Sequence, residues 1–273
     1  MPELPEVETV RTGLHRSLAG STIESVQLLR PDLRIPFPAH LAKTLAGRKI
    51  RGITRRAKYL LWDLDSDDVI LSHLGMSGRF IVRSTPEPPA IHDHMELRMT
   101  DGRQVLYHDP RRFGLITLSS RKELVGHPLL VHLGPEPLNE EFDAAYLKKV
   151  LATRKGPVKA ALMDQALVVG VGNIYASEAL YISGLHPLKP ANSCAGKANA
   201  LVPAIRHVLQ AAITSGGSSL RDFLDISGET GYFQHGFAVY GREGKPCKHC
   251  KTAIENIKIT GRSSFFCPEC QRL

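Results

Sequence analysis

Residues 247–270 read CKHCKTAIENIKITGRSSFFCPEC, and this stretch decides the fold of the C-terminal end of the chain. It contains two Cys-x-x-Cys pairs with sixteen residues between them: Cys247 and Cys250, then Cys267 and Cys270. Each short turn directs two thiolates at one ion, and four thiolates complete the tetrahedron of a structural zinc site. The alternatives are a chance pattern or a redox dithiol. Cys194 stands apart from both pairs and is interpreted as a packed or surface thiol.

The residues between the two pairs predict a β-hairpin that the zinc ion closes. Apolar and polar side chains alternate over 253–259 and 263–266, and Thr260-Gly261-Arg262 is the expected turn. From residue 242 onward the chain holds seven Lys or Arg and three Glu, which is a net charge of +4. A basic hairpin with Arg262 at its tip suits the backbone or groove of a nucleic-acid duplex. A dimerisation finger or a purely structural finger is the alternative.

The segment before this hairpin has the periodicity of helices. Apolar residues recur every three or four positions in four stretches: residues 142–152, 157–165, 174–183 and 197–215. The loop-like stretch GPEPLNEEF precedes them, and a glycine- and serine-rich stretch at 216–234 predicts a mobile loop. We therefore expect three domains: residues 1–134, 135–237 and 238–273.

The first of these domains combines one helix with many short strands. Apolar residues recur at helical spacing from Leu4 to Leu18, and Gly20 is placed to end that helix. Alternating patterns then predict seven strands: residues 23–29, 50–63, 69–73, 79–83, 94–99, 105–108 and 115–118. Short strands with Gly, Pro and Asp between them indicate a sandwich or a barrel rather than a parallel sheet.

Composition and charge narrow the class of protein. The chain has 273 residues, a formal net charge of +8 and a pI of about 9.3. An excess of positive charge is expected of a protein that binds phosphates, although many basic proteins bind nothing anionic. No apolar run approaches the roughly 20 residues that span a bilayer, and the acidic start MPELPEVETV is unlike a signal peptide. We therefore expect an intracellular protein whose five cysteines serve metal binding or packing rather than disulfides.

The second residue carries possible covalent chemistry. A proline directly after Met1 favours removal of the initiator, which would leave Pro2 with a free secondary amine. Model α-amino groups have pKa values of about 7.7–8.0, so a useful fraction of such an amine is neutral near pH 7. The amine can attack a sugar C1′ and form an iminium, with Glu3 beside it to donate or relay a proton. Most N-terminal prolines do nothing of this kind, so an ordinary first helical turn is the alternative.

Nine blocks of sequence, spread over the whole chain, resemble one family. In chain order they are MPELPEVETV, RRAKYLL, HLGMSG, HDH, DPRRFG, LGPEPL, VGVGNIYASEAL, VYGREGKPC and FCPECQ. The family is bacterial formamidopyrimidine-DNA glycosylase, also called 8-oxoguanine DNA glycosylase/AP lyase. The resemblance implies an α+β fold: an N-terminal helix plus β-sandwich, a helix–two-turn–helix domain, and a C-terminal β-hairpin zinc finger.

The resemblance also implies the catalytic residues. Pro2 matches the Schiff-base nucleophile and Glu3 the neighbouring general acid. Lys58 matches the lysine that assists β-elimination and contacts phosphate; alone, it would be interpreted as a solvated or phosphate-pairing charge. Arg262 matches the finger arginine of phosphate binding and δ-elimination.

A second set of residues resembles the family's DNA contacts. Three match the side chains that fill the gap left by an extruded nucleotide: Met76, Arg111 and Phe113. Without the resemblance, the methionine and the phenylalanine would be interpreted as core residues. The others align with backbone or base contacts: His92, Arg111, Arg154 and Asn173. The alignment of Arg154 can shift by one residue onto Lys155, and Asn173 alone would be interpreted as a helix N-cap. The stretch 216–234 matches the base-recognition loop.

The resemblance implies a bifunctional DNA glycosylase/AP lyase of base excision repair. It would excise oxidised purines, namely 8-oxoguanine opposite cytosine and formamidopyrimidines, from duplex DNA and cleave the strand by β,δ-elimination. It would act as a monomer in the bacterial cytoplasm, associated with the nucleoid, with one structural zinc ion, no diffusible cofactor and no membrane partner. The alternatives are an endonuclease-VIII-like glycosylase for oxidised pyrimidines, a non-catalytic DNA-binding protein and a ribosome-associated zinc module.

Overall fold

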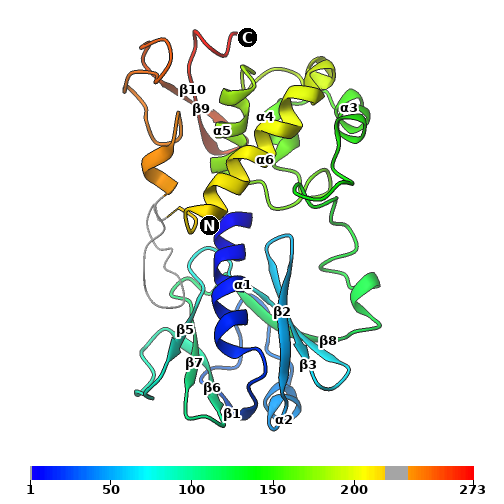
Figure 1. The fold of residues 1–273 in the computed structure, drawn as a ribbon, viewed down its shortest axis with the longest axis vertical. Helices are drawn as coiled ribbons and strands as arrows, with labels where there is room; N and C mark the ends of the chain where they lie inside the picture. Colours follow the sequence, from blue (N-terminus) through cyan, green and yellow to red (C-terminus); the bar gives the residue numbers. More distant parts are fainter. Residues whose placement is uncertain (1, 219–232) are drawn as a thin grey trace. The chain divides into compact units, whose positions relative to one another are not determined.

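The structure is a computed structural model that describes residues 2–218 and 233–273 (Figure 1). Most of the loop expected at 216–234 therefore lies outside the described residues. The described chain forms two compact units. Residues 2–131 with 216–218 make the first unit, and residues 132–215 with 233–273 make the second. No helix in the described ranges is long and apolar enough to cross a membrane.

The first unit begins with helix α1 (Leu4–Leu18), as the periodicity predicts. Its apolar stripe is fully buried, and Pro5 is tolerated because the first turn needs no amide donors. Glu3 precedes the helix as its N-cap, and the Glu3 backbone N–H donates to Glu6 Oε2 at 2.8 Å. This half of a capping box satisfies an amide that would otherwise be buried without a partner. The helix ends at the residue before Ala19, and Gly20 follows with φ of 86°.

Eight antiparallel strands form two four-stranded sheets, which confirms the predicted sandwich. One sheet has the order β1 (Ile23–Leu28), β6 (Asp93–Met99), β7 (Gln104–His108) and β5 (Arg79–Arg83). The other has the order β2 (Ile50–Arg56), β3 (Tyr59–Leu64), β4 (Asp68–His73) and β8 (Leu115–Ser120). A short helix that the sequence did not predict, α2 (Leu41–Leu45), contacts β1.

The single strand predicted at 50–63 is wrong. It is a hairpin of β2 and β3, with Arg56 paired to Tyr59 across the turn. Ala57 occupies that turn in the left-handed region, with φ of 54°. The residue lacks the usual signals of a turn, Gly, Asn or Pro, so the pattern alone could not place one here.

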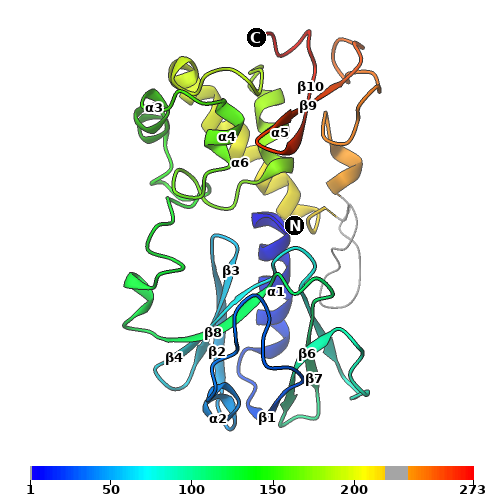
Figure 2. The ribbon, with the colours of Figure 1, turned by 180° about the vertical axis from the view of Figure 1, so that it is seen from behind.

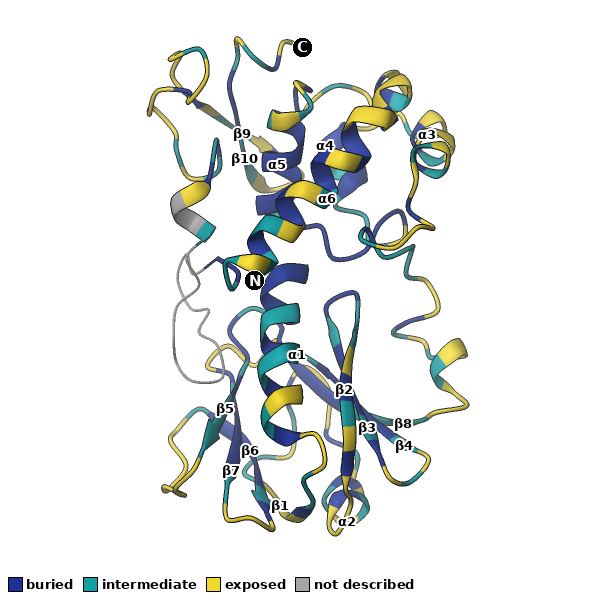
Figure 3. Cartoon of the chain, in the orientation of Figure 1, coloured by how far each residue is buried: buried dark blue, intermediate teal, exposed yellow. Residues whose placement is uncertain are grey.

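Aromatic side chains join the two sheets in the core of the first unit. Trp62 of β3 packs on Phe80 of β5, and Phe80 packs on Tyr107 of β7, each with ring centroids 5.0 Å apart. Trp62 also donates from its indole N–H to Ser72 Oγ at 3.1 Å. Helix α1 packs against β2, and its apolar residues belong to the same core. Buried positions recur along the strands, and many of the turns between them are exposed (Figure 3).

The second unit is helical and carries a hairpin. Its helices are α3 (Ala144–Ala152), α4 (Val158–Leu162), α5 (Asn173–Ile182) and α6 (Ala198–Thr214). Buried and exposed faces alternate along α6 (Figure 3), and α5 packs on it. Strands β9 (Glu255–Ile259) and β10 (Arg262–Phe266) pair beside α5, as Figure 2 shows from behind.

Arg262 is the first residue of β10 rather than part of the turn, which corrects the expected turn at 260–262. It pairs with Ile259, and only Thr260 and Gly261 lie between them. Both have positive φ, 47° and 77°, which is the geometry of a two-residue type I′ hairpin.

Candidate functional site

The N-terminal pair predicted to carry chemistry lies at the start of α1. Pro2 and Glu3 are both buried, and Glu3 is only 2% exposed. Glu6 holds this end of the chain, because its Oε2 accepts the Glu3 amide while its Oε1 accepts from Ser218. The Ser218 backbone N–H and hydroxyl donate to that oxygen at 2.8 and 2.9 Å. Glu6 thus fixes the backbone of Glu3 and the start of the expected recognition loop.

Sequence reasoning missed Glu6. Its position three residues after an N-cap is the signal that could have found it.

Lys58 follows the strained Ala57 in the β2–β3 turn and is 7% exposed. The interpretation of a solvated surface lysine is therefore wrong. Its charge is close to His73, whose pKa is lowered to about 4, first by burial and then by Lys58 and Arg34. The imidazole of His73 is therefore neutral near pH 7. His73 Nδ1 accepts the Gly75 amide at 2.9 Å, so the ring is fixed at the base of the next loop.

The predicted gap-filling residues sit on loops of the first unit. Phe113 is 47% exposed and Arg111 is exposed, so the phenylalanine is not a core residue. The Arg111 guanidinium carbon lies 5.0 Å from the centre of the Phe113 ring. This cation–π stack stabilises an aromatic side chain that would otherwise stand alone in solvent. Met76 is partly buried.

A buried hydrogen-bond network holds the loop that carries this stack. Asp109 is fully buried, and its carboxylate accepts from Ser77 Oγ at 2.6 Å and from the Gly114 amide at 2.8 Å. Ser77 Oγ in turn accepts from the Arg111 amide at 3.1 Å. Gly75 has φ of 63° and packs against the backbone of Phe113. A Cβ at this position would lie 2.3 Å from the Phe113 carbonyl carbon. The exposed stack therefore stands on a rigid base.

In the second unit a buried lysine links α4, α5 and the hairpin. Lys159 is 1% exposed, and its Nζ donates to three oxygens: Asn173 Oδ1 at 2.7 Å, Ser264 Oγ at 2.8 Å and the Ser263 carbonyl at 3.1 Å. Asn173 Nδ2 also donates to that carbonyl, at 3.0 Å. The start of α5 and the residue after Arg262 are thus held together.

Sequence reasoning missed Lys159, since nothing in its local pattern marks burial. The structure also corrects the N-cap alternative for Asn173, because Gly172 is the N-cap and Asn173 is the first helical residue.

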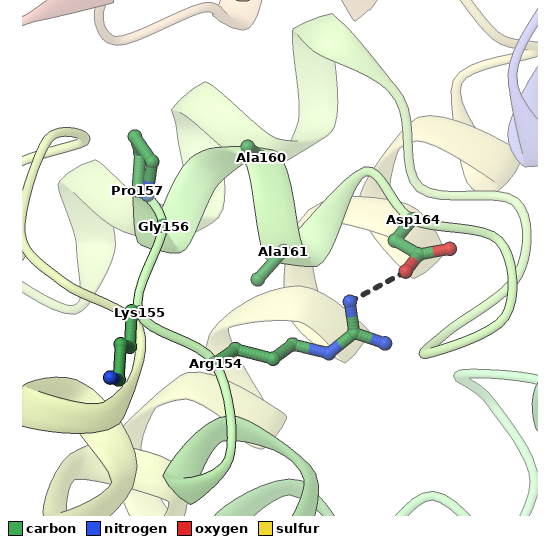
Figure 4. A pocket seen from close by; sticks show the side chains of 7 residues that line it. All are labelled: Arg154, Lys155, Gly156, Pro157, Ala160, Ala161 and Asp164. Carbon is green, nitrogen blue, oxygen red and sulfur yellow. Dashed lines mark hydrogen bonds and ion pairs between the residues drawn. The ribbon is translucent and has the colours of Figure 1, made fainter.

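Arg154 and Lys155 differ in their surroundings. Arg154 Nη1 pairs with Asp164 Oδ2 at 2.6 Å across an open hollow of about 320 Å³. Figure 4 shows the guanidinium turned toward the carboxylate and Lys155 pointing away from it. Lys155 is exposed. The protein already supplies an anion to Arg154, so Lys155 is the more available cation of the two.

Four thiols gather at the base of the hairpin, as the spacing predicts. The Sγ atoms of Cys247, Cys250, Cys267 and Cys270 all lie within 4.8 Å of one another. A tetrahedron of zinc–sulfur bonds of about 2.3 Å needs separations of this size, so the residues fit one structural zinc ion. Tyr181 O–H lies 3.2 Å from Cys247 Sγ, and burial and the neighbouring thiols raise the pKa of Tyr181. The hydroxyl therefore stays protonated and can support the thiolate.

Cys194 lies outside this cluster, as expected, and is 1% exposed. Burial raises the pKa of its thiol, which suits a packed and unreactive side chain.

A buried glutamate fixes the backbone that leads into the finger. Glu178 of α5 is 4% exposed and accepts from three successive amides, those of Ala238, Val239 and Tyr240, at 2.8 to 3.0 Å. This residue too was missed by sequence reasoning, because its partners lie about sixty positions away in the chain.

Comparison with known families agrees with this arrangement. Three family models match the chain: the formamidopyrimidine-DNA glycosylase N-terminal domain at residues 1–116, the formamidopyrimidine-DNA glycosylase H2TH domain at 133–224, and the zinc finger found in FPG and IleRS at 244–273. The fold and the site define a glycosylase of the helix–two-turn–helix, zinc-finger class. The chain belongs to the formamidopyrimidine-DNA glycosylase family.

Individual relatives match over their full length. The formamidopyrimidine-DNA glycosylase of Cereibacter sphaeroides is 50% identical, with 100% of both chains covered. A crystal structure of Lactococcus lactis Fpg with DNA containing N7-benzyl-Fapy-dG superimposes with a TM-score of 0.92 at 37% identity, again over 100% of both chains. A structure of MutM with DNA containing carbocyclic 8-oxo-G gives a TM-score of 0.91 at 38% identity, with 100% of both chains covered.

The packing of Gly75 against the Phe113 loop generates a stability prediction. Gly75→Ala should destabilise the protein by clearly more than the roughly 1–2 kcal/mol that a left-handed alanine costs, because its Cβ meets backbone. Gly102→Ala is the matched control, since Gly102 has φ of 87° and open space around it. Chemical denaturation of both variants measures the difference. Equal losses of stability would contradict the close approach.

The thiol cluster generates a metal prediction. Cys267→Ser should lower zinc content from about one ion per chain to a small fraction after dialysis against a chelator, because three thiolates hold the ion more weakly. Cys194→Ser removes a buried thiol outside the cluster and should keep its zinc. Elemental analysis of the purified variants gives the answer, and unchanged zinc in the Cys267 variant would exclude this site.

Proposed function

We propose that this chain is a bifunctional DNA glycosylase/AP lyase of base excision repair. It excises oxidised purines, 8-oxoguanine opposite cytosine and formamidopyrimidines, from duplex DNA and cleaves the strand by β,δ-elimination. Family membership and relatives solved with Fapy-dG and 8-oxo-G DNA support this function. The observation that carries the chemistry is the buried Pro2–Glu3 pair at the start of α1, with the Glu3 backbone held by Glu6.

The reaction starts at the Pro2 nitrogen once Met1 has been removed. Its lone pair attacks C1′ of the damaged nucleotide, the C1′–N bond breaks, and the departing base takes up the proton that the Pro2 amine loses. Glu3 supplies a proton to the sugar ring oxygen as the ring opens to the iminium. The iminium acidifies the proton on C2′, and loss of that proton expels the 3′ phosphate. A second elimination expels the 5′ phosphate, with Lys58 and Arg262 in the roles that the family implies.

DNA binding falls to side chains of both units. His92, Arg111 and Asn173 contact the backbone or the opposite base, and Met76 and Phe113 occupy the gap left by the extruded nucleotide. The exposed Arg111–Phe113 stack supports this role, because an apolar wedge with a cation recovers part of the lost stacking. The last predicted contact falls at Arg154 or Lys155. Because Arg154 is paired with Asp164, we propose Lys155 as the phosphate contact.

Lys159 serves binding indirectly. Its ammonium touches Asn173 and the residues after Arg262, so it sets the position of two proposed phosphate ligands from within the protein. The zinc ion, when bound, supplies only structure, because four thiolates leave no open coordination position. We further propose that the protein works as a monomer in the bacterial cytoplasm, at the nucleoid.

The assignment of Pro2 generates a covalent-trapping prediction. Borohydride should trap the protein on an 8-oxoguanine:cytosine duplex, and mass spectrometry should place the adduct on Pro2, because only an iminium is reduced to a stable bond. Pro2→Gly should trap with a yield lower by about tenfold or more. Pro5→Ala, which changes a proline in the same helical turn, should trap normally. An undiminished adduct with Pro2→Gly would overturn the assignment, and preferred action on thymine glycol would favour the oxidised-pyrimidine alternative.

The network around Lys159 generates a binding prediction. Lys159→Met keeps the volume but leaves three acceptors without their donor, each at a cost of about 1–3 kcal/mol. We expect DNA affinity to fall by about tenfold as Asn173 and β10 lose their common support. Lys149→Met removes an exposed charge from α3 and is the matched control. Fluorescence anisotropy with an abasic-analogue duplex measures both, and equal affinities for the two variants would exclude the positioning role.

A further inference from the structure

A row of polar side chains crosses three strands of the first unit beside the loop that carries Phe113. Arg79 of β5 pairs in register with His108 of β7, and His108 pairs with Asp93 of β6. Residues directly opposite each other in antiparallel strands project to the same face of the sheet. The three side chains therefore form one continuous row, and no step described above uses it.

Asp93 orients His108 within this row. The carboxylate is 4% exposed; its Oδ1 accepts from His108 Nδ1 at 2.8 Å and its Oδ2 accepts the Ala90 amide at 2.7 Å. A carboxylate offers no proton to such contacts, so Nδ1 carries the hydrogen and the tautomer and ring plane of His108 are fixed. Arg79 does not compete for this carboxylate, because its buried Nε has no acceptor within the described part of the chain.

His108 in turn packs against His92. The two rings meet edge to face, with centroids 5.8 Å apart and planes inclined by 80°. The residue after His108 adds a second restraint, because the Asp109 amide donates to the His92 carbonyl at 2.9 Å. His92 is only partly buried, so part of its ring remains accessible. Both its backbone and its imidazole are thus held from the end of β7.

We propose that Asp93 and His108 are positioning residues that hold the His92 imidazole in the orientation that contacts a DNA phosphate. The inference rests on the proposed DNA-binding function of His92. A pair of this kind lowers the entropy lost when the ring binds, since a fixed ring has fewer orientations to give up. His108 acts through His92 and does not itself touch the DNA.

A double-mutant cycle tests this positioning. His108→Phe keeps a ring of similar size but removes the donor to Asp93, and His92→Ala removes the ring that is positioned. We expect His108→Phe to weaken binding of an abasic-analogue duplex by about tenfold in the wild-type background and by less than about twofold in the His92→Ala background. His15→Phe is the control: His15 is a more exposed histidine of this unit, and its Nδ1 accepts the backbone amide of Ile53 on β2, a strand of the other sheet.

Each outcome of this cycle decides the inference. Equal losses from His108→Phe in both backgrounds, or a similar loss from His15→Phe, would mean a general structural effect and would overturn it. No loss from His108→Phe in the wild-type background would also overturn it. If His92→Ala binds the duplex as tightly as the wild type, His92 does not contact the DNA and the inference is overturned. Borohydride trapping on Pro2 at saturating DNA, measured in the same variants, shows separately whether the proposed glycosylase chemistry stands.

Discussion

Buried backbone amides in irregular segments need acceptors, and in this protein buried carboxylates supply them. A helix or sheet satisfies most of its own amides, but a loop that packs against the core needs a carbonyl, a side chain or water for each of them. Glu6 accepts the Ser218 amide, Asp109 accepts the Gly114 amide, and Glu178 accepts three amides that lead into the finger. The segments that carry the proposed chemistry are therefore held by single acidic residues placed on helices and strand ends.

The sequence predicts the features that depend on neighbouring residues, but it misses those that depend on contacts between distant residues. The zinc hairpin, helix α1 and most strands follow from spacing within a few residues, and the structure confirms them. The β2–β3 turn was not predicted, because Ala57 adopts a left-handed conformation and the turn contains none of the residues that usually mark one. Lys159 and Glu178 were not predicted, because their partners are distant in the chain. Periodicity indicates which face of a helix is buried, but it does not indicate a buried charge. The roles of Pro2 and the other catalytic residues came from the resemblance and stay predictions.

Burial of a charged group is costly, so each buried charge in this structure has to be explained by its partners. A lysine taken out of water loses several kcal/mol of hydration, and only close acceptors offset that loss. Lys159 has three such acceptors on two different elements, α5 and β10. A methionine of similar volume could fill the same space, but it would not select one register of the hairpin against the helix. The ammonium therefore contributes orientation as well as stability.

Orientation is also the reason for the metal and for the tight turn in the finger. A hairpin of two five-residue strands is marginal in water by itself. Zinc closes one end through four thiolates, and the two-residue turn at Thr260 and Gly261 closes the other, so Arg262 begins β10 at a position with little freedom. Lys159 then fixes the next residue to α5. Three independent restraints therefore act on one exposed arginine. A side chain held in this way suits the phosphate contact that is proposed for Arg262.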